Sequence, residues 1–443
     1  MKTVVILGPD FSPSSHPPAL RVRFFASHLR EFGWNPIVIA TDPGYYETTI
    51  DPENERLLPS GLEVIRTAAL PARVTRLFGL GDLGWRSLWH NWRALRRIII
   101  ERRPELLFLP TPPSPGLLLG RLAAYRYGIP YVVDLIDPIA TDYYWRLPRA
   151  QRPPKWWLAS RSGRWIERTA LRRASHITAV DAAYADGALH RYPWLKSSDV
   201  SGIPYGAEPA DFEYVRRNPR QNQIFNSDDG KLHCCYVGVV GPYLLPAVRA
   251  LLGALRHGLD RDPELFGRVQ LHFVGTSYTP EAAPKVLPMA REAGVAALVT
   301  ERPSRVGYLD AIQLQLSADM LVALGSEEAH YTASKIFPYL LANRPLLAIF
   351  HEQSSVVRIL RGTRAAEPIT FQSSGDLAGA TEHILQEWQR LLKSPHISTG
   401  GERMAAFQPY TARAMAEKLA RVFQAVSCAP RAAAVSAAVG SLQ

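Results

Sequence analysis

The stretch 334–350 reads SKIFPYLLANRPLLAIF and contains a helix followed at once by a strand. The polar pair at its start opens the helix, and the apolar run at its end has the length of a buried strand. The sequence Ala-Asn-Arg-Pro between them stops the helix, because proline cannot continue it. A helix that leads directly into a buried strand is typical of a parallel sheet with helical crossovers.

The same alternation of short apolar strands and helices extends over most of the 443 residues. A chain of this length exceeds one ordinary core, so two domains of about 200 residues are expected. Each is predicted to be α/β, with a doubly wound, Rossmann-like parallel sheet. Strands are expected at 4–7, 36–40, 62–66, 106–109, 131–135 and 176–180, and then at 232–237, 269–274, 320–324 and 346–350.

A polar and charged segment, EYVRRNPRQNQIFNSDDG at 213–230, interrupts this alternation. It has no long apolar periodicity, which favours a linker between domains. The predicted organisation is a first domain over 1–212, the linker, and a second domain over 231–410. A helix over 411–427 is expected to pack back on the first domain. The tail 428–443 is rich in small residues and is expected to be disordered.

The composition places the chain among soluble globular proteins. Hydrophobic residues make up 47% and charged residues 21%. No apolar run approaches the roughly 18 residues of a membrane span, and the N-terminus lacks a secretory signal pattern, so a cytoplasmic protein is expected. The cysteines Cys234, Cys235 and Cys428 lack metal-ligand spacing and are predicted to be buried as small hydrophobes. No metal and no cofactor is expected.

The net charge of +11 belongs mostly to the first half, where residues 1–200 carry 27 Lys and Arg against 18 Asp and Glu. Arginine and tryptophan alternate in two stretches, 73–103 and 146–173. This mixture suits the anionic surface of a membrane, where tryptophan lies at headgroup depth and arginine meets phosphate. A solvated helix face with its aromatics turned to the core is the other interpretation. Nucleic acid would attract the same charges, but no nucleic-acid-binding motif accompanies them.

Two segments of the second half suit an anionic ligand. Ser334 and Lys335 open a helix, so that backbone N–H groups, the helix dipole and an ammonium group converge there. Gly238 and Gly241 follow an apolar strand, and glycine lets the backbone approach a phosphate closely. A diphosphate is the expected guest, and a surface helix with a solvated lysine is the alternative. The loop lacks the full G-x-G-x-x-G pattern, which disfavours a dinucleotide.

The segment 335–345 resembles the K-(I/L/V)-(F/Y)-E-Y-L-A-x-(G/R)-x-P box of glycosyltransferase family 4, in which the lysine meets the donor diphosphate. The resemblance implies a GT-B fold, with two Rossmann-like domains facing across a crevice. It also places Gly241 against the donor phosphates and Tyr308 near the donor base. Four further stretches resemble family motifs in the same order: ASHITAV at 174–180, IPYGAE at 203–208, VGYL at 306–309 and SADML at 317–321.

The sequence departs from the family pattern at two positions of the expected site. Pro338 stands where most members have the glutamate that holds the nucleotide ribose, and His330 stands where a second acid is common. Glu327 and Glu328 lie close by and are candidates to take over the ribose contact. In the first domain, Thr111 stands where many members have a histidine. A retaining reaction is expected from the resemblance alone.

Candidate acceptor residues lie in the first half. The loop at 11–21 corresponds to a family loop that touches both sugar and acceptor. It offers Ser15 to the acceptor and His16 as a catalytic candidate, although a lone histidine in a proline-rich loop is more often only solvated. Arg21 and Arg23 open the next helix and are predicted to meet an acceptor phosphate. Asp137 ends a buried strand and is the preferred candidate to orient or deprotonate the acceptor hydroxyl, although capping the turn before Pro138 explains it equally well.

These features predict a glycosyltransferase of the hexosyltransferase type. A nucleotide-sugar donor would supply the sugar, and a lipid-linked or saccharide acceptor near the membrane would receive it, in surface polysaccharide or glycolipid synthesis. The protein is expected at the inner face of the cell membrane, peripherally bound. Two alternatives keep the fold: a non-catalytic scaffold, and a sugar-nucleotide 2-epimerase, for which the sequence offers few charged acid and base residues.

Overall fold

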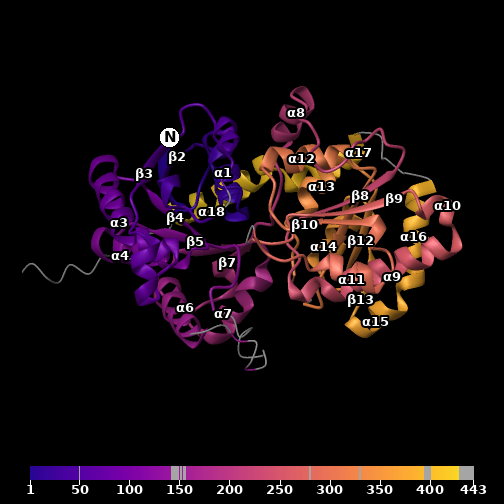
Figure 1. The fold of residues 1–443 in the computed structure, drawn as a ribbon. Helices are drawn as coiled ribbons and strands as arrows, with labels where there is room; N and C mark the ends of the chain where they lie inside the picture. Colours follow the sequence, from indigo (N-terminus) through magenta and orange to yellow (C-terminus); the bar gives the residue numbers. More distant parts are fainter. Residues whose placement is uncertain are drawn as a thin grey trace, which may run out of the picture. The chain divides into compact units, whose positions relative to one another are not determined.

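The computed structural model describes residues 1–48, 50–140, 149, 152, 156–278, 281–328, 331–393 and 401–428, with side chains omitted at 401–403. The chain forms two compact units. Unit 1 comprises Met1–Pro204 and the chain from Arg413 onward, and unit 2 comprises Tyr205–Ala412. Figure 1 shows an α/β arrangement in each unit, with helices packed around a sheet.

Unit 1 contains a seven-stranded sheet in which every described pair of strands is parallel. The strand order is β3-β2-β1-β4-β5-β6-β7, so the chain winds in one direction from β1 and then in the other from β4. Val4–Leu7 and Leu106–Leu109 are fully buried at its centre. The strands are β1 (Lys2–Leu7), β2 (Trp34–Thr41), β3 (Glu63–Thr67), β4 (Leu106–Thr111), β5 (Tyr131–Leu135), β6 (His176–Ala179) and β7 (Val200–Gly202).

The helices of unit 1 include the last described helix of the chain. Phe423 of α18 packs edge-on against Trp34 of β2 and Phe108 of β4, with ring centroids 5.3 and 5.4 Å apart. Lys2 adds hydrogen bonds to Gln424 and Ser427. The helices are α1 (Pro17–His28), α2 (Ala72–Thr75), α3 (Leu83–Arg102), α4 (Leu117–Tyr127), α6 (Trp156–Leu171), α7 (Asp186–Arg191) and α18 (Ala412–Cys428).

Unit 2 contains a six-stranded parallel sheet with the order β10-β9-β8-β11-β12-β13. The direction of winding again reverses at the centre, between β8 and β11. Cys234 and Cys235 are buried in β8, as predicted, whereas Cys428 is exposed, because it ends α18 at the surface. The strands are β8 (Leu232–Val237), β9 (Val269–Val274), β10 (Val299–Arg302), β11 (Met320–Leu324), β12 (Leu346–His351) and β13 (Ile369–Phe371).

Helices cover the sheet of unit 2 and complete its core. Trp388 of α16 is fully buried against Phe266, and α9 packs on the same cluster. The helices are α8 (Pro209–Arg217), α9 (Leu245–Arg261), α10 (Pro263–Phe266), α11 (Val286–Glu292), α12 (Tyr308–Ser317), α13 (Ile336–Ala342), α14 (Ser355–Gly362), α15 (Ser374–Gly379), α16 (Thr381–Lys393) and α17 (Gly401–Phe407).

The segment 213–230, predicted as a linker, belongs to unit 2. Its first residues form the end of α8, and Arg220 bonds Asp310 of α12 at 2.5 Å. Phe225 stacks on His233 of β8 and His272 of β9, with ring centroids 4.0 and 5.0 Å apart. The tail predicted at 428–443 lies outside the described residues after Cys428.

Candidate functional site

The sheet of unit 2 reverses its winding between β8 and β11, and two loops leave the sheet at that point. At such a switch point the following chain segments run to opposite sides, which opens a crevice at the carboxyl ends of the strands. The loop after β8 contains Gly238 and Gly241, and the segment after β11 contains Glu327, Glu328, Ser334 and Lys335. The topology therefore brings together the residues that the sequence predicts for the donor.

Lys335 is the central cation at the carboxyl ends of β8 and β11. Its Nζ lies 3.9 Å from the centroid of the Tyr236 ring and donates a hydrogen bond to the Tyr236 hydroxyl. Burial and, to a lesser extent, the nearby charge of Arg305 together lower the pKa of Lys335 from 10.5 to about 7. Helix α13 begins directly after Lys335 but has only seven residues, so the ammonium group, rather than a helix dipole, supplies the field. A buried cation with a weakened charge is ready to receive an anion.

The glycine loop passes directly beside this lysine. Gly238 has a φ of +143°, which residues with a side chain rarely adopt, and a Cβ there would lie 3.1 Å from the Nζ of Lys335. A Cβ on Gly241 would lie 2.4 Å from the ring of Tyr243. Glycine at positions 238 and 241 thus lets the loop backbone approach the Lys335 ammonium group and the Tyr243 ring more closely than a residue with a side chain would.

Two further cations lie in this region, one hydrogen-bonded to the loop after β8 and one near enough to influence Lys335, and the sequence alone did not indicate either. Arg305 follows β10, packs 5.6 Å from the centroid of the Tyr278 ring, and has its pKa lowered by burial. Lys285 donates a hydrogen bond of 3.1 Å from Nζ to the carbonyl of Val240. No local motif distinguishes these residues, because only the neighbouring crossovers of the sheet bring them near β8.

Tyrosines form one side of the site. The rings of Tyr243 and Tyr331 lie 5.5 Å apart, and Tyr236 is fully buried with its hydroxyl donating to the carbonyl of Val239 at 2.9 Å. Burial raises the pKa of Tyr236 well above its usual value, and the nearby tyrosines Tyr331 and Tyr243 contribute. The Tyr236 hydroxyl therefore stays neutral and acts as a hydrogen-bonding group beside Lys335.

The remaining predicted donor residues lie around this centre. Ser334 is half-buried, and Glu327 and Glu328 are exposed. The Glu327 carboxylate accepts a hydrogen bond of 2.6 Å from the N–H of Ser374, at the start of α15. The Glu328 N–H donates to Ser326, and its carbonyl accepts from the N–H of Tyr331. His330 lies outside the described residues.

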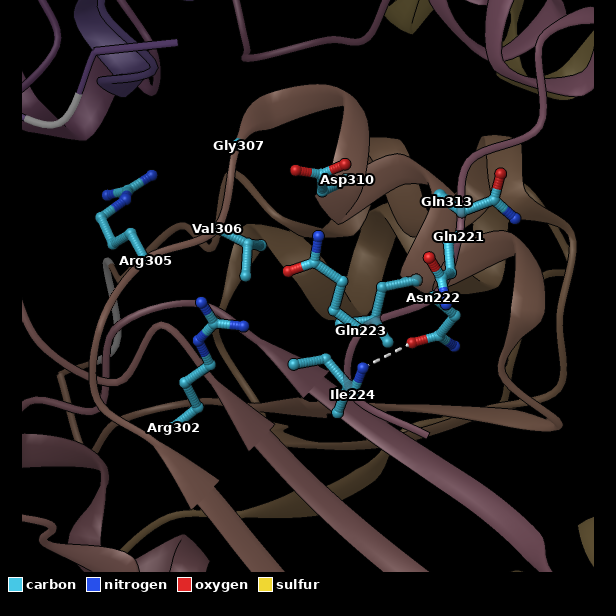
Figure 2. Close-up of a pocket in the computed structure, with 11 residues that line it drawn as sticks. Gln221, Asn222, Gln223, Ile224, Arg302, Arg305, Val306, Gly307, Asp310 and Gln313 are labelled. Carbon is cyan, nitrogen blue, oxygen red and sulfur yellow. Dashed lines mark hydrogen bonds between the residues drawn. The ribbon is translucent and has the colours of Figure 1, made fainter. Parts of the chain in front are cut away.

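Tyr308 begins α12, and its hydroxyl donates to Asp211 of α8 at 2.7 Å. A pocket of about 140 Å³ lies beside this turn, with Arg305, Gly307 and Asp310 on one side and Asn222 on the other (Figure 2). Figure 2 shows that Arg302 and Arg305 both extend along the rim of the pocket. The volume is too small for a whole sugar nucleotide, which needs several hundred Å³.

The sheet of unit 1 reverses its winding between β1 and β4, and the loop after β1 carries predicted acceptor residues. His16 lies 3.7 Å from the carboxylate of Asp10, measured from Nδ1 to Oδ2. Burial raises the pKa of Asp10 to about 6, and its Oδ1 has no hydrogen-bond partner among the described residues. Ser15 is buried and its hydroxyl accepts from Asn54 at 3.3 Å. Asp10 lies three residues after the end of β1 and was not predicted as a site residue from the sequence.

Arg21 and Arg23, predicted to meet an acceptor, lie inside unit 1. The Arg21 guanidinium makes two hydrogen bonds to the Asp134 carboxylate, at 2.7 and 3.0 Å, and a third to the carbonyl of Ile203. The Arg23 guanidinium lies 4.8 Å from the centroid of the Phe24 ring. The contacts of Arg21 therefore join α1 to the end of β5 and to the segment after β7, whereas the contact described for Arg23 lies within α1.

Asp137 and Thr111 follow neighbouring strands at the carboxyl edge of this sheet. A large part of Asp137 is exposed, yet the protein around its carboxyl group raises its pKa above the usual value. Thr111 is buried, and its hydroxyl donates to the carbonyl of Asp134 at 3.2 Å. In the described ranges no three His, Cys, Asp or Glu side chains are grouped as metal ligands would be. In the same ranges no helix combines the length and apolarity of a membrane span.

Comparison with known proteins identifies the domain and the fold. Residues 18–206 match the model of the glycosyl transferase 4-like domain. Among curated proteins, no sequence match to the chain was found. The predicted GT-B fold is confirmed, and the predicted likeness to family 4 glycosyltransferases is confirmed over residues 18–206.

Solved structures match along nearly the whole chain. Sucrose-phosphate synthase from Thermosynechococcus elongatus aligns with a TM-score of 0.63 and 15% identity, over 97% of this chain and 100% of its own. HepE from Anabaena, in complex with UDP-glucose, aligns with a TM-score of 0.61 and 14% identity, over 96% and 100%. The α,α-trehalose-phosphate synthase (UDP-forming) from Burkholderia xenovorans, in complex with glucose-6-phosphate, aligns with a TM-score of 0.61 and 12% identity, over 96% and 100%.

Proposed function

We propose that this chain, with its glycosyl transferase 4-like domain and GT-B fold, transfers a sugar from a nucleoside diphosphate donor to an acceptor hydroxyl. The observation that carries the proposal is the position of Lys335. Lys335 is half-buried, and its ammonium group lies against the Tyr236 ring and beside Gly238 at the switch point of unit 2, where α/β sheets bind ligands. A cation that has lost part of its hydration at such a place is unfavourable unless an anion pairs with it, so an anionic ligand is expected there.

The donor diphosphate would lie between the glycine loop and the cations. The bond between the anomeric carbon and the diphosphate oxygen breaks, so negative charge grows on the leaving diphosphate. Lys335 and Arg305 stabilise this charge from a water-poor site, where electrostatic interactions are strong. The glycines at 238 and 241 let the phosphate oxygens reach backbone N–H groups.

The residues that would contact the rest of the donor are assigned from their positions in the chain. Glu327 and Glu328 follow β11 and take the ribose contact that Pro338 lacks. Ser334 adds a hydroxyl group next to Lys335. Tyr308 is assigned to the part of the site that holds the nucleotide base of the donor. UDP-sugars are the first donors to test, because HepE, which shares the fold, was solved with UDP-glucose. No metal or cofactor is required in this proposal, since the cations supply the charge.

The acceptor is assigned to unit 1. Asp137 orients the acceptor hydroxyl, and His16 with Ser15 contacts the sugar or the acceptor at the end of β1. Arg21 serves this site as a positioning residue: it fixes Asp134 at the end of β5, from which Asp137 emerges. Arg23 stiffens the first turns of α1 in the same way. Retention of the anomeric configuration belongs to the proposal and is read from the product by NMR.

The acceptor is proposed to be lipid-linked or a saccharide held near the inner face of the cell membrane. The basic character of the first 200 residues supports this location, because a phosphate-rich surface attracts them. Synthesis of a surface polysaccharide or glycolipid is the proposed setting. The second candidate is a scaffold protein without catalytic turnover. It is favoured by Pro338 and Thr111, which stand where most family members have a glutamate and many have a histidine.

The test is turnover with defined donors. Wild type and Lys335→Ala are incubated with UDP-, GDP- and ADP-sugars and a membrane extract, and release of the nucleoside diphosphate is measured. Lys335→Ala is expected to lower kcat about 100-fold or more, the usual effect of removing one charge-stabilising group. Lys231→Ala, an exposed lysine of the same unit, is the matched control and is expected to keep full activity. Equal activity of Lys335→Ala and wild type would overturn the site assignment.

A further inference from the structure

Helix α6 (Trp156–Leu171) presents a basic and aromatic face to solvent. Trp157, Arg161, Arg164, Trp165 and Arg168 are all exposed. Their spacing of 4, 3, 1 and 3 residues places them within about a third of the helix circumference at 100° per residue. The Arg161 guanidinium lies 5.7 Å from the centroid of the Trp157 ring, so cation and aromatic ring already form a unit on this face.

The opposite face of α6 is buried in the core of unit 1. Ile166 and Ala170 pack there among the apolar side chains of the sheet. Glu167 is the only acidic residue of the helix, and it is also buried, with its carboxylate 2.7 Å from Arg191 and accepting from the N–H of Ala140. The exposed face of this fully described helix therefore carries arginine charge that no acidic side chain of the helix offsets.

An apolar projection adjoins the start of this helix. The segment 70–80, which includes α2, exposes Leu77 at 79% and Phe78 at 73%, two of the most exposed large apolar residues of the chain. Leu70, Val74 and Leu80 are also exposed, at 42–53%. Leu158 of α6 reaches this segment, because its Cδ2 lies 3.9 Å from the position of a Cβ on Gly79.

Large apolar side chains gathered on a soluble surface mark a contact with an apolar partner. Here the projection at 70–80 and the arginine face of α6 form one surface, which we name the α6 surface, and its members are Leu77, Phe78, Trp157, Leu158, Arg161, Arg164, Trp165 and Arg168.

We infer that the α6 surface docks on an anionic lipid bilayer, with Leu77 and Phe78 entering the apolar layer and the arginines of α6 meeting lipid phosphates. Charge complementarity favours a bilayer, since the exposed face of α6 combines arginine with tryptophan and the one acidic residue of that helix, Glu167, is buried. Four of the five exposed large apolar residues of the projection are aliphatic, and these suit the apolar layer of a bilayer better than they suit the stacking of nucleic-acid bases. The inference makes specific the membrane location in the proposed function.

The experiment is co-sedimentation of the full chain with vesicles of phosphatidylcholine alone and with about 30% phosphatidylglycerol. Wild type is expected to bind the anionic vesicles and to be released by salt. Arg161→Gln with Arg168→Gln is expected to weaken binding about 10-fold or more, given the contribution of each arginine near an anionic surface. Leu77→Ser with Phe78→Ser is expected to weaken it about 10-fold or more through lost apolar burial.

Two matched controls carry the same chemical changes elsewhere. Ile100→Ser removes an exposed aliphatic side chain of α3, and Lys231→Gln with Arg358→Gln removes two exposed charges of unit 2. Both are expected to bind as wild type does. Wild type that ignores lipid charge, fails to bind vesicles, or binds equally with and without the α6-surface side chains would overturn the inference. A protein partner would account for such a result.

The same variants separate this inference from the proposed function. Each is also tested for the rise in melting temperature with a nucleoside diphosphate, which reports the donor site in unit 2. Loss of vesicle binding with an intact nucleotide response is the expected outcome for the α6-surface variants. Wild type that binds vesicles but responds to no nucleotide would contradict the proposed donor and leave the bilayer contact standing.

Discussion

Lys335 is the residue on which the proposed donor site depends, and its surroundings explain why its charge destabilises the folded protein without a bound anion. The ammonium group lies over the Tyr236 ring with Arg305 near enough to lower its pKa. Burying a cation beside another cation is unfavourable, and active sites commonly hold such groups for function. A bound diphosphate would reverse the balance, because it would raise the pKa of Lys335 again.

The first prediction concerns Lys335→Met, which removes the charge and keeps the length of the side chain. The folded pKa of about 7 lies below the unfolded value of 10.5, so the folded state releases this proton more readily. The loss of folding stability caused by the Lys335 charge is therefore complete below pH 7, and it decreases as pH rises from 7 to about 10.5. At pH 6 the variant is expected to melt about 2–4 °C higher than wild type, the shift that corresponds to about 1 kcal/mol in a domain of this size.

The measurement is thermal unfolding of both proteins between pH 6 and pH 9. The gap between their melting temperatures is expected to shrink towards pH 9, because the charge is lost there from folded wild type. The hydroxyl of Tyr236 keeps its acceptor at Val239 in the variant, so no buried donor is left without a partner. A gap that stays constant with pH, or a variant that melts lower at every pH, would contradict a buried charged lysine.

Sequence reasoning predicted some site residues and missed others for a physical reason. Lys335 and Gly241 lie in local segments whose residue types alone suggest an anion site. Arg305 and Asp10 carry no local signal, because their role depends on which crossovers and strands become neighbours. Arg21 resembled a surface cation in the sequence, but its hydrogen bonds to Asp134 place it in the core.

The loop after β8 is the element on which the proposed contact between unit 2 and the donor phosphates depends. Gly238 leaves the strand at a positive φ, and the side chain of Lys335 fills the space where its Cβ would be. Gly241 is similarly constrained by the ring of Tyr243. The loop can therefore change neither backbone shape nor residue size without moving the cation.

Gly238→Ala is accordingly expected to lower nucleotide affinity about 10-fold or more, since backbone strain and a clash with Lys335 act together. Isothermal titration with the nucleoside diphosphate measures the effect. Gly362→Ala, at the end of α14 with nothing within 4 Å of the added Cβ, is the matched control and is expected to bind as wild type does. Equal affinity in Gly238→Ala would show that the loop does not approach the ligand.

At the level of elements, the sequence predicted the central strands and missed short ones at the edges. Strands such as β1 and β12 are continuous apolar runs, which favour burial on both faces. The missed strands β7, β10 and β13 have only three or four residues, and polar side chains interrupt them. Helix α14 was missed as well, since it follows β12 after a short turn.

On the scale of the whole molecule, the chain consists of two units that share the same type of sheet topology. Each is a parallel sheet with one reversal of winding, and each reversal lies where predicted ligand residues occur. The two-unit α/β organisation could be predicted from the alternation of strands and helices. The assignment of 413 onward to unit 1 depends on contacts such as that between Phe423 and Trp34, which no local pattern determines.

The measurement that tests the central claim most directly is a thermal-shift screen of nucleoside diphosphates and sugar nucleotides against wild type and Lys335→Met. A ligand that binds the folded state at 100 times its Kd stabilises it by about 2.7 kcal/mol. One nucleotide is predicted to raise the melting temperature of wild type selectively, more at pH 6 than at pH 9, and to leave Lys335→Met unchanged. An equal rise in both proteins, or no rise with any nucleotide, would contradict a donor site at Lys335.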